Sequence, residues 1–197
     1  MIKYKGQQIS HAITKTQYLD IIDDLRKRKK LKILSCVLFM GTKGLRISDT
    51  LNLKIVDVFH KNGTLRSNLR FKNQKQKKFM QIPLDNGKDT YFKRILEQYY
   101  FLVADRPIET FLFEGDTTIK LSQSVVKQHL KRYKNDFGID QLSCHSFRKY
   151  FGKSLFEQGV PIETISAIYQ HADVSITRTY LDINRFDIIE AMEKINY

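Results

Sequence analysis

The sequence has few of the features that mark specialised protein classes. Of its 197 residues only two are cysteines, Cys36 and Cys144, and they lack the close pairing of a zinc site or a disulfide framework. The longest apolar run, Ile33 to Met40, is far short of the roughly 20 residues that cross a bilayer, and no hydrophobic leader opens the chain. We therefore expect a protein of the reducing cytoplasm.

Glycine and proline are also scarce, at nine and three residues. No linker rich in Pro, Gly or Ser, no low-complexity stretch and no repeat of solenoid period divides the chain. Hydrophobic residues make up 42% of it, which is typical of one globular unit with an adequate core. We expect a single domain over residues 1–197, in which residues 1–13 form a short N-terminal arm.

Acidic residues are also few relative to basic ones. Lys and Arg number 34 against 21 Asp and Glu, which gives a net charge of +13 and a pI near 9.7. This excess suggests a polyanionic partner, with nucleic acid as the leading candidate. A ribosome-associated or membrane-surface protein could carry the same balance, so charge indicates a class of partner and not a reaction.

The hydrophobic periodicity predicts an α+β fold, mainly α-helical with a small antiparallel β-sheet. Thr16 is expected to cap the first helix. Apolar residues recur in that helix at Tyr18, Leu19, Ile22 and Leu25. Further helices are expected over 31–40, from Arg46, and over 88–104, 122–136 capped by Ser122, 145–158, 162–170, 174–181 and 185–195. Strands are predicted over 55–59, 64–71 and 79–84, with a short extended piece at 111–113.

Two segments concentrate basic residues. Positions 61–78 hold seven basic residues and no acid: Lys61, Arg66, Arg70, Lys72, Lys75, Lys77 and Lys78. The helix from Ser122 carries Lys127, Lys131 and Arg132 among others. The tip of the predicted hairpin is thus expected to be the most positive surface of the chain. The helix is as consistent with a solvated face as with one that faces a nucleic-acid groove.

Five chemistry-bearing residues follow one another in a suggestive order. Arg46 stands in Gly-Leu-Arg-Ile-Ser-Asp at 44–49, near an expected helix start. His145 and Arg148 are three apart, so they would project from one side of a helix and could reach one anion. His171 lies at an expected helix junction, and Tyr180 follows nine residues later. The His-x-x-Arg step alone is a weak signal, whereas the ordered set is a specific one.

This order and spacing resemble the tyrosine recombinase (phage integrase) family, over residues from about 14 to 195. The resemblance rests on residues 44–49, a basic hairpin followed by Ile82-Pro83-Leu84, the box His145-Ser146-Phe147-Arg148, and His171 followed by Tyr180. It implies the catalytic-domain fold of that family and DNA strand exchange without metal or ATP, so no cofactor is expected. It also implies that Tyr180 attacks a backbone phosphate, giving a 3′-phosphotyrosyl enzyme and a free 5′-hydroxyl.

Elementary chemistry agrees with the roles that the resemblance implies. A phosphorane transition state gathers negative charge on its equatorial oxygens, and guanidiniums keep their protons and present rigid forks, which nominates Arg46 and Arg148 as its clamp. A tyrosine hydroxyl with an ordinary pKa near ~10 needs a proton acceptor. In family geometry His145 is the nearest base, and His171 would hydrogen-bond a nonbridging oxygen.

The leaving 5′-oxygen needs a proton, which in the family comes from a lysine at the hairpin turn. Counting back eight residues from Pro83, as the family hairpin does, gives Lys75, with Lys72 and Lys77 as competitors because this turn lacks the glycines often found there. Asp49 could orient the active-site cations or form an ordinary i,i+3 charge pair. The basic residues expected to contact DNA phosphates are Lys72, Lys77, Lys78, Lys127, Lys131 and Arg132.

Two further departures from the family pattern qualify the resemblance. Most members carry a separate N-terminal domain, and Arg46 comes too early for one here. We therefore expect a catalytic-domain-only member, resembling fimbrial-type invertases or plasmid and phage resolvases, that needs self-association on double-stranded DNA or accessory DNA-bending proteins. Gln170 stands where many relatives have glycine, which predicts altered packing of that turn. The apolar stripe of helix 185–195 could fold onto its own domain or dock on a neighbour.

Two rival functions use the same residues. A type IB topoisomerase-like relaxer would share the phosphotyrosine chemistry but rejoin the original strand. A DNA-binding regulator of the same fold could have lost activity, although the joint presence of both arginines, both histidines and Tyr180 argues against it. The sequence does not support a two-metal nuclease, because its acidic residues are scattered and show no pairing that is typical of a metal site.

Overall fold

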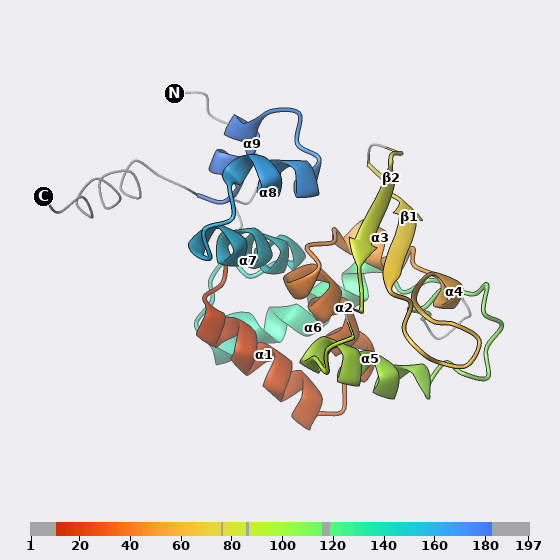
Figure 1. Ribbon diagram of the computed structural model, residues 1–197. Coiled ribbons are helices and arrows are strands. Elements are labelled where there is room, and N and C mark those ends of the chain that lie inside the picture. The colour runs from red at the N-terminus through yellow and green to blue at the C-terminus, as the bar shows by residue number, and fades with distance from the viewer. Residues whose placement is uncertain (1–10, 76, 86, 116–118, 183–197) are drawn as a thin grey trace, which may run out of the picture.

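The computed structural model describes residues 11–182 apart from 76, 86 and 116–118. Over these residues the chain is mainly helical with one two-stranded antiparallel sheet, which confirms the predicted fold class (Figure 1). The helices are α1 (Lys15–Lys27), α2 (Leu31–Thr42), α3 (Ile47–Leu51), α4 (Ile55–Val58), α5 (Tyr91–Tyr100), α6 (Gln123–Asp136), α7 (Cys144–Glu157), α8 (Ile162–Tyr169) and α9 (Val174–Tyr180). The strands are β1 (Asn68–Lys72) and β2 (Phe79–Pro83).

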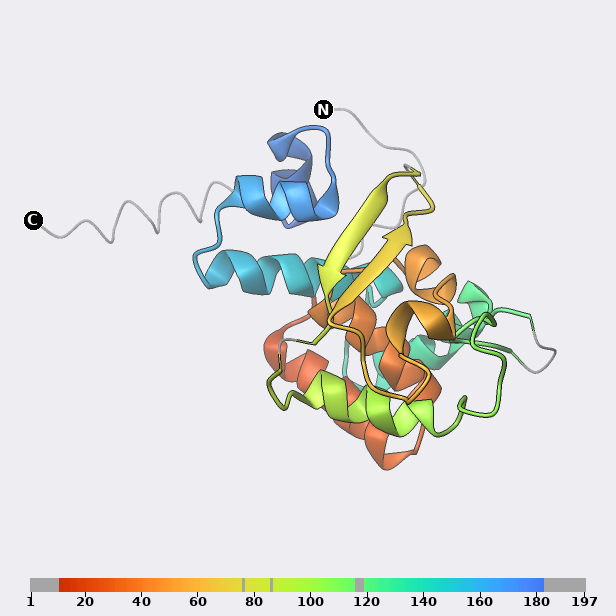
Figure 2. The same ribbon diagram turned by 45° about the vertical axis from the view of Figure 1, so that its right-hand side comes forward.

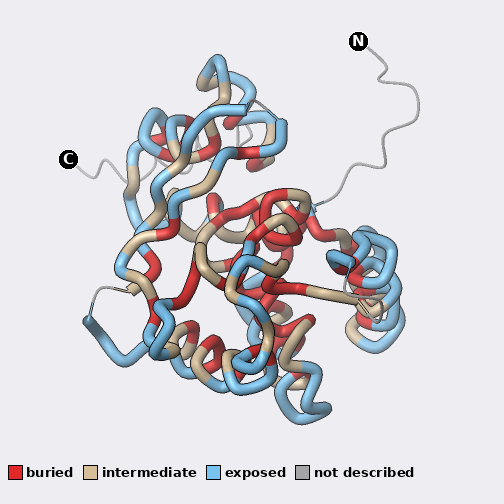
Figure 3. The backbone as a smooth tube through the Cα atoms, turned by 90° about the vertical axis from the view of Figure 1, so that its right-hand side faces the viewer, coloured by how far each residue is buried: buried red, intermediate tan, exposed pale blue. Residues whose placement is uncertain are grey.

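Helix α2 is the centre of the larger core, because its apolar sequence leaves it no polar face. Every residue from Ile33 to Gly41 is buried, and α2 packs against α1, α5 and α7. Figure 3 shows the buried backbone in the interior of the body, with exposed turns around it. Burial of each large apolar side chain contributes about 1.5–3 kcal/mol, so α2 fixes the position of the helices around it.

Helix α1 begins two residues earlier than the sequence suggested. Thr14 caps it: its Oγ1 accepts from the N–H of Gln17 at 3.1 Å, and the N–H of Thr14 donates to Gln17 Oε1 at 2.9 Å. Thr16 cannot form this reciprocal pair, because the residue three positions on is Leu19. The predicted apolar stripe was also wrong at Leu19, which is 47% exposed. The buried face consists of Tyr18, Ile21, Ile22 and Leu25.

The strand predicted over 55–59 is wrong, since residues 55–58 form α4. The N–H groups of Ile55 and Val56 donate to the carbonyls of Thr110 and Ile108, at 3.1 and 2.9 Å. Asp57 accepts from the N–H of Lys54 at 2.7 Å, which caps the turn. A short apolar run is compatible with either a strand or a buried helical turn, and these tertiary contacts decide it.

The sheet is therefore a single hairpin. Asn68 pairs with Pro83 and Lys72 with Phe79, in antiparallel register. The strand predicted from residue 64 begins only at Asn68, while Leu65 makes an isolated bridge with Phe59. In two views the hairpin rises from the helical body beside α8 and α9 (Figures 1 and 2).

A second, smaller core lies where α8 and α9 pack on α7. It consists of Ile165, Tyr169 and Leu181, with Phe151 and Leu155 of α7 among the partly buried residues against it. The same helix contributes Phe147 to the larger core. Helix α7 is thus the connection between the two cores, and the seam between them is the natural place for a site.

None of the described helices is both long and apolar enough to cross a membrane. The predicted helix over 185–195 lies outside the described residues, as do positions 1–10 of the predicted arm.

Candidate active site

Arg148 projects from α7 into the seam between the cores. Phe147, the preceding residue, packs in the larger core, and Phe151, three residues further on, packs against the smaller one. Arg148, between them, is only 6% exposed. Its Nη1 donates to the carbonyl of Gly44, and its guanidinium carbon lies 4.2 Å from the centre of the Tyr169 ring. Packing and hydrogen bonding therefore fix the fork in one orientation.

Arg46, the residue that precedes α3, extends its side chain to the same seam. Its Nη2 donates to the backbone oxygen of Tyr169 at 3.3 Å, and Nη2 of Arg148 donates to that same oxygen at 3.4 Å. Nη1 of Arg46 lies 4.0 Å from Oδ2 of Asp49, whose side chain is 3% exposed. Burial and then the charge of Arg46 lower the pKa of Arg148. The two guanidiniums thus converge on one oxygen, in the arrangement that would clamp an anion.

His171 lies in the turn between α8 and α9, beside the arginine pair. Its Nδ1 is 2.9 Å from the hydroxyl of the buried Thr177. Its ring centre lies 5.4 Å from that of Tyr169 and 5.6 Å from that of Tyr180. Burial, followed by the charges of Arg148, Arg46 and Lys75, lowers the pKa of His171 to about 4. The imidazole is therefore neutral at pH 7.

Tyr180 ends α9 with its ring packed edge to face on Tyr169 and 5.3 Å from Nζ of Lys149. Burial raises the pKa of Tyr180, and the charges of Arg148 and Arg46 oppose that rise. The hydroxyl is buried, and it lies close enough to Arg148 for that side chain to counter the rise. The phenol is thus buried beside a guanidinium.

His145 stands on the first turn of α7, where its N–H donates to the Ser143 hydroxyl at 3.2 Å. Partial desolvation and then the charges of Arg148 and Arg46 lower the pKa of its imidazole. The side chain is exposed. His145 therefore lies near both arginines on a side that is open to a substrate.

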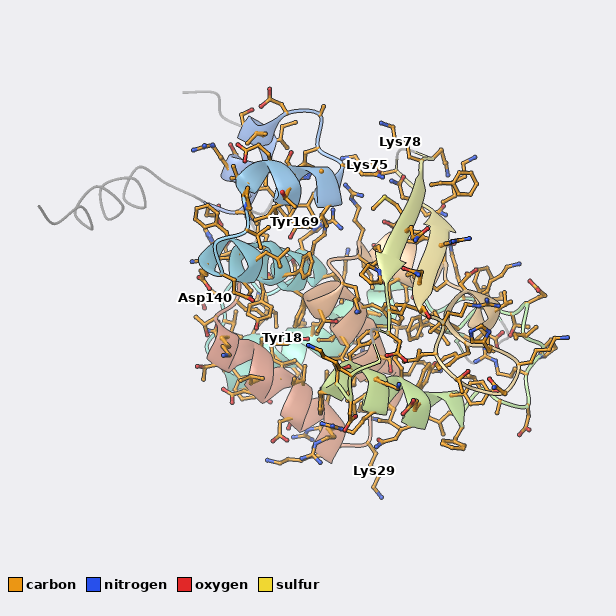
Figure 4. All side chains as sticks on the ribbon, viewed as in Figure 1. Tyr18, Lys29, Lys75, Lys78, Asp140 and Tyr169 are labelled. Carbon is orange, nitrogen blue, oxygen red and sulfur yellow. The ribbon has the colours of Figure 1, made fainter. Side chains whose placement is uncertain are left out.

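Lys75 lies between the tip of the hairpin and the unit formed by α8 and α9, whereas Lys78 lies at the outer end of the tip (Figure 4). The charge of Lys75 contributes to the lowered pKa of His171. Lys75 and its competitors, Lys72 and Lys77, are all exposed. Lys77 adopts a left-handed backbone with φ of 57°, which closes the turn without a glycine.

The expected DNA-contacting residues Lys72, Lys77, Lys78, Lys127, Lys131 and Arg132 are all exposed. They are not equivalent. The charge of Lys127 is among those that lower the pKa of His145, so Lys127 lies toward the site. Nε of Arg132 is 2.8 Å from Oδ2 of Asp136, a surface pair that occupies its fork.

Sequence reasoning missed two contributors to this site. The ring of Tyr169 is fully buried, and its backbone oxygen is the acceptor that both arginines share. The contact of its backbone oxygen with both arginines had no sequence signal, because a carbonyl belongs to every residue. Lys149 is 6% exposed beside Tyr180, with Nζ 3.1 Å from Oδ2 of Asp182. The sequence feature that could have indicated Lys149 is its position directly after Arg148.

Comparisons with known proteins identify similar sequences. A family model described as the phage integrase family matches residues 11–185. A probable integrase/recombinase of Acholeplasma phage L2 is 27% identical over 160 residues, which cover 78% of this chain and 50% of that protein. Tyrosine recombinase XerA of Pyrococcus furiosus is 29% identical over 185 residues, which cover 94% and 62%. The chain thus spans between half and two thirds of the length of these relatives.

Solved structures share the fold at lower identity. A crystal structure of XerA recombinase has a TM-score of 0.75 at 19% identity and covers 98% of this chain and 68% of its own. XerH site-specific recombinase, bound to its palindromic difH substrate after cleavage, has a TM-score of 0.72 at 16% identity, with 97% and 55% covered. A lambda integrase dimer bound to a COC′ core site has a TM-score of 0.64 at 17% identity, with 92% and 51% covered.

Proposed function

The chain belongs to the phage integrase family, and on that premise we propose that it is a tyrosine-type site-specific recombinase, which cleaves and rejoins DNA strands through a 3′-phosphotyrosyl intermediate. The convergence of Arg46 and Arg148 on one oxygen carries the proposal. A phosphodiester oxygen that displaced the Tyr169 carbonyl would meet two charged forks already aligned, and such preorganised charge is often the largest catalytic contribution.

Cleavage begins with attack by Oη of Tyr180 on phosphorus, and the phenolic proton passes to His145. This transfer is needed because burial keeps the pKa of Tyr180 above its ordinary value. The neutral His171 donates a hydrogen bond to a nonbridging oxygen through Nε2, since its Nδ1 is engaged with Thr177. As the bond from phosphorus to the 5′-oxygen breaks, Lys75 gives that oxygen a proton.

Double-stranded DNA is the substrate and partner in this proposal. The net charge of +13 and the exposed lysines of the hairpin suit a polyanion. Strand exchange requires two sites held together, so we propose self-association on DNA, as a dimer or a tetramer, assisted by DNA-bending proteins. A recombinase of similar fold has been solved as a DNA-bound dimer, which supports this assembly.

The proposal is tested with nicked suicide duplexes, selected for binding from a random-sequence pool. We expect a covalent protein–DNA adduct without divalent metal, visible on a denaturing gel. Tyr180→Phe should abolish the adduct because the nucleophilic oxygen is gone. Tyr100→Phe serves as the control, since Tyr100 lies far from the site on α5, where its hydroxyl donates to the carbonyl of Lys61.

An adduct that persists in Tyr180→Phe would contradict the nucleophile, and absence of any adduct in the parent protein would contradict the reaction. Joining of strands from two separate cognate sites distinguishes a recombinase from an enzyme that only relaxes supercoils.

A further inference from the structure

Gln170 joins the turn that carries His171 to the hairpin that carries Lys75. Its Oε1 accepts a hydrogen bond from Nδ2 of Asn73, the first residue after β1. Its Nε2 contacts Sδ of Met80 on β2. One side chain from the α8–α9 turn thus contacts both arms of the hairpin. Its partner Asn73 is 1% exposed, so the contact is shielded from solvent.

The backbone of Gln170 makes this contact costly. Its φ is 55° and its ψ is 42°, the left-handed conformation that terminates α8. Glycine adopts this conformation freely, whereas a side chain with a Cβ is disfavoured there. Glutamine therefore adopts this conformation against its local preference, which directs attention to what its side chain does.

A second anchor holds the neighbouring residue of the hairpin. The N–H of Gln74 donates to Oδ1 of Asp49 at 2.8 Å, and Oδ2 of the same carboxylate faces Arg46 at 4.0 Å. Residues 73 and 74 are thus tied to opposite sides of the site. A small cavity beneath them is lined among others by Arg46, Asn73 and Arg148. The base of the hairpin tip therefore borders the arginine pair.

We propose that Gln170 is a positioning residue: through Asn73 it holds the hairpin so that Lys75 can protonate the leaving 5′-oxygen. This inference rests on the proposed function. Lys75 lies two residues beyond Asn73, so a shift of that anchor is transmitted directly to the lysine. A misplacement of about 1 Å can cost on the order of a hundredfold in rate, which is the scale at which such an anchor matters.

Two nicked substrates separate this role from a merely structural one. The first carries the normal 5′-oxygen at the scissile phosphate, and the second carries sulfur there. A thiolate, with a pKa near ~8.5, leaves without a proton donor, so Lys75→Ala should be slow on the oxygen substrate and close to the parent protein on sulfur. We expect Gln170→Gly to behave in the same way, with single-turnover cleavage about 10- to 100-fold slower on oxygen and unchanged on sulfur.

Matched variants exclude simpler explanations. Gln170→Asn keeps an amide and a residue type that tolerates the left-handed conformation, but it is one methylene too short for Asn73, so it should share the defect. Asn73→Ala should match Gln170→Gly, and the double variant should be no slower than either, since both changes remove one contact. The thermal unfolding midpoint of Gln170→Gly should stay close to that of the parent protein, because relief of the backbone offsets the lost hydrogen bond.

Equal slowing of Gln170→Gly on both substrates would overturn the inference, because the defect would then lie outside proton donation. Unchanged cleavage of both would overturn it as well. If the parent protein forms no adduct with either substrate, or if sulfur fails to rescue Lys75→Ala, the proposed function or its proton donor fails first and the inference falls with it.

Discussion

The two imidazoles of the candidate site are held in the neutral form by their surroundings. The pKa of His171 is lowered to about 4 by burial and then by the charges of Arg148, Arg46 and Lys75. That of His145 is lowered in the same direction by desolvation and the two arginines. A neutral ring can accept the proton of Tyr180 or donate to a phosphate oxygen, whereas a third and fourth cation would add repulsion.

The depressed pKa of His171 predicts sensitivity to acid. The unfolded chain has the ordinary histidine pKa near ~6.5, so between about pH 6.5 and pH 4 it binds a proton that the folded protein does not. The free energy of unfolding must therefore fall as the pH falls through this window, and the contribution is absent above it. We expect His171→Asn to show a shallower fall, measured as the urea midpoint from pH 7 to pH 4.

The control for this measurement is His60→Asn, since His60 is exposed and remote from the arginine pair. It should keep the pH dependence of the parent protein. A His171→Asn curve that runs parallel to the parent curve would contradict the proposed environment of the ring.

At the scale of elements, the site depends on how closely α8 and α9 approach α7. Gly152 of α7 permits this approach: a Cβ there would lie 2.3 Å from Oη of Tyr169 and 2.8 Å from Cδ2 of Leu181. The Tyr169 hydroxyl also donates to the carbonyl of Arg148. The close contact between Gly152 and Tyr169 therefore also fixes the Tyr169 ring against the guanidinium of Arg148.

Gly152→Ala should destabilise the protein even though the same change stabilises most helix interiors, by up to about 1 kcal/mol. The added methyl overfills the interface, and overpacking typically costs about 1–3 kcal/mol. Urea unfolding measures the sign directly. Lys153→Ala, at an exposed position on the same helix, should change stability by less than about 0.5 kcal/mol. A gain in stability for Gly152→Ala would show that the interface is looser than the contacts indicate.

Helices with a regular apolar period were predictable, and elements decided by distant contacts were not. The segment 122–136 was predicted from its Ser122 cap and matches α6. The run from Ile55 to Val58 reads as a strand, because its apolar residues carry no period, and its helical turn depends on carbonyls at 108 and 110. A local sequence pattern reflects hydrogen bonds between residues close in the chain. It carries no information on acceptors about fifty residues away, such as the carbonyls of Ile108 and Thr110.

The same distinction applies to the site. Arg46, His145, Arg148, His171 and Tyr180 were nominated by residue type and spacing, and the structure brings them to one seam, while their catalytic roles stay predictions. The packing of Gln170 was expected only to differ from that of glycine. Its left-handed φ and its contact with Asn73 are properties of the folded chain, so no reading of residue type alone could have given them.

At the scale of the whole molecule, positive charge is present at opposite ends. Lys75 and Lys78 lie at the hairpin end and Lys29 at the far end of the helical body (Figure 4). Only the hairpin end adjoins the arginine clamp. If DNA is held over that clamp, its phosphates meet the hairpin lysines, and the lysines at the far end contribute mainly to the long-range field.

The salt dependence of DNA binding distinguishes the two ends. Each phosphate contact contributes about −0.9 to the slope of log affinity against log salt concentration. Replacing Lys72, Lys77 and Lys78 by Gln should therefore make the slope less steep by up to about 3 units. The control replaces Lys27, Lys29 and Lys30 by Gln, which removes the same charge from the far end and should leave the slope nearly unchanged. Equal effects of the two triple variants would mean that DNA does not prefer the hairpin end.

The division into two cores assigns the parts of the constellation to different bodies. Arg46, His145 and Arg148 belong to elements seated on the larger core, while His171 and Tyr180 belong to the unit around the smaller one. A displacement of that small unit would move Oη of Tyr180 away from the site, while Arg46 and Arg148 would stay in place. Under the proposed function, phosphate binding and strand cleavage would then depend on different bodies, and the protein could stay bound to uncut DNA while the smaller unit is displaced.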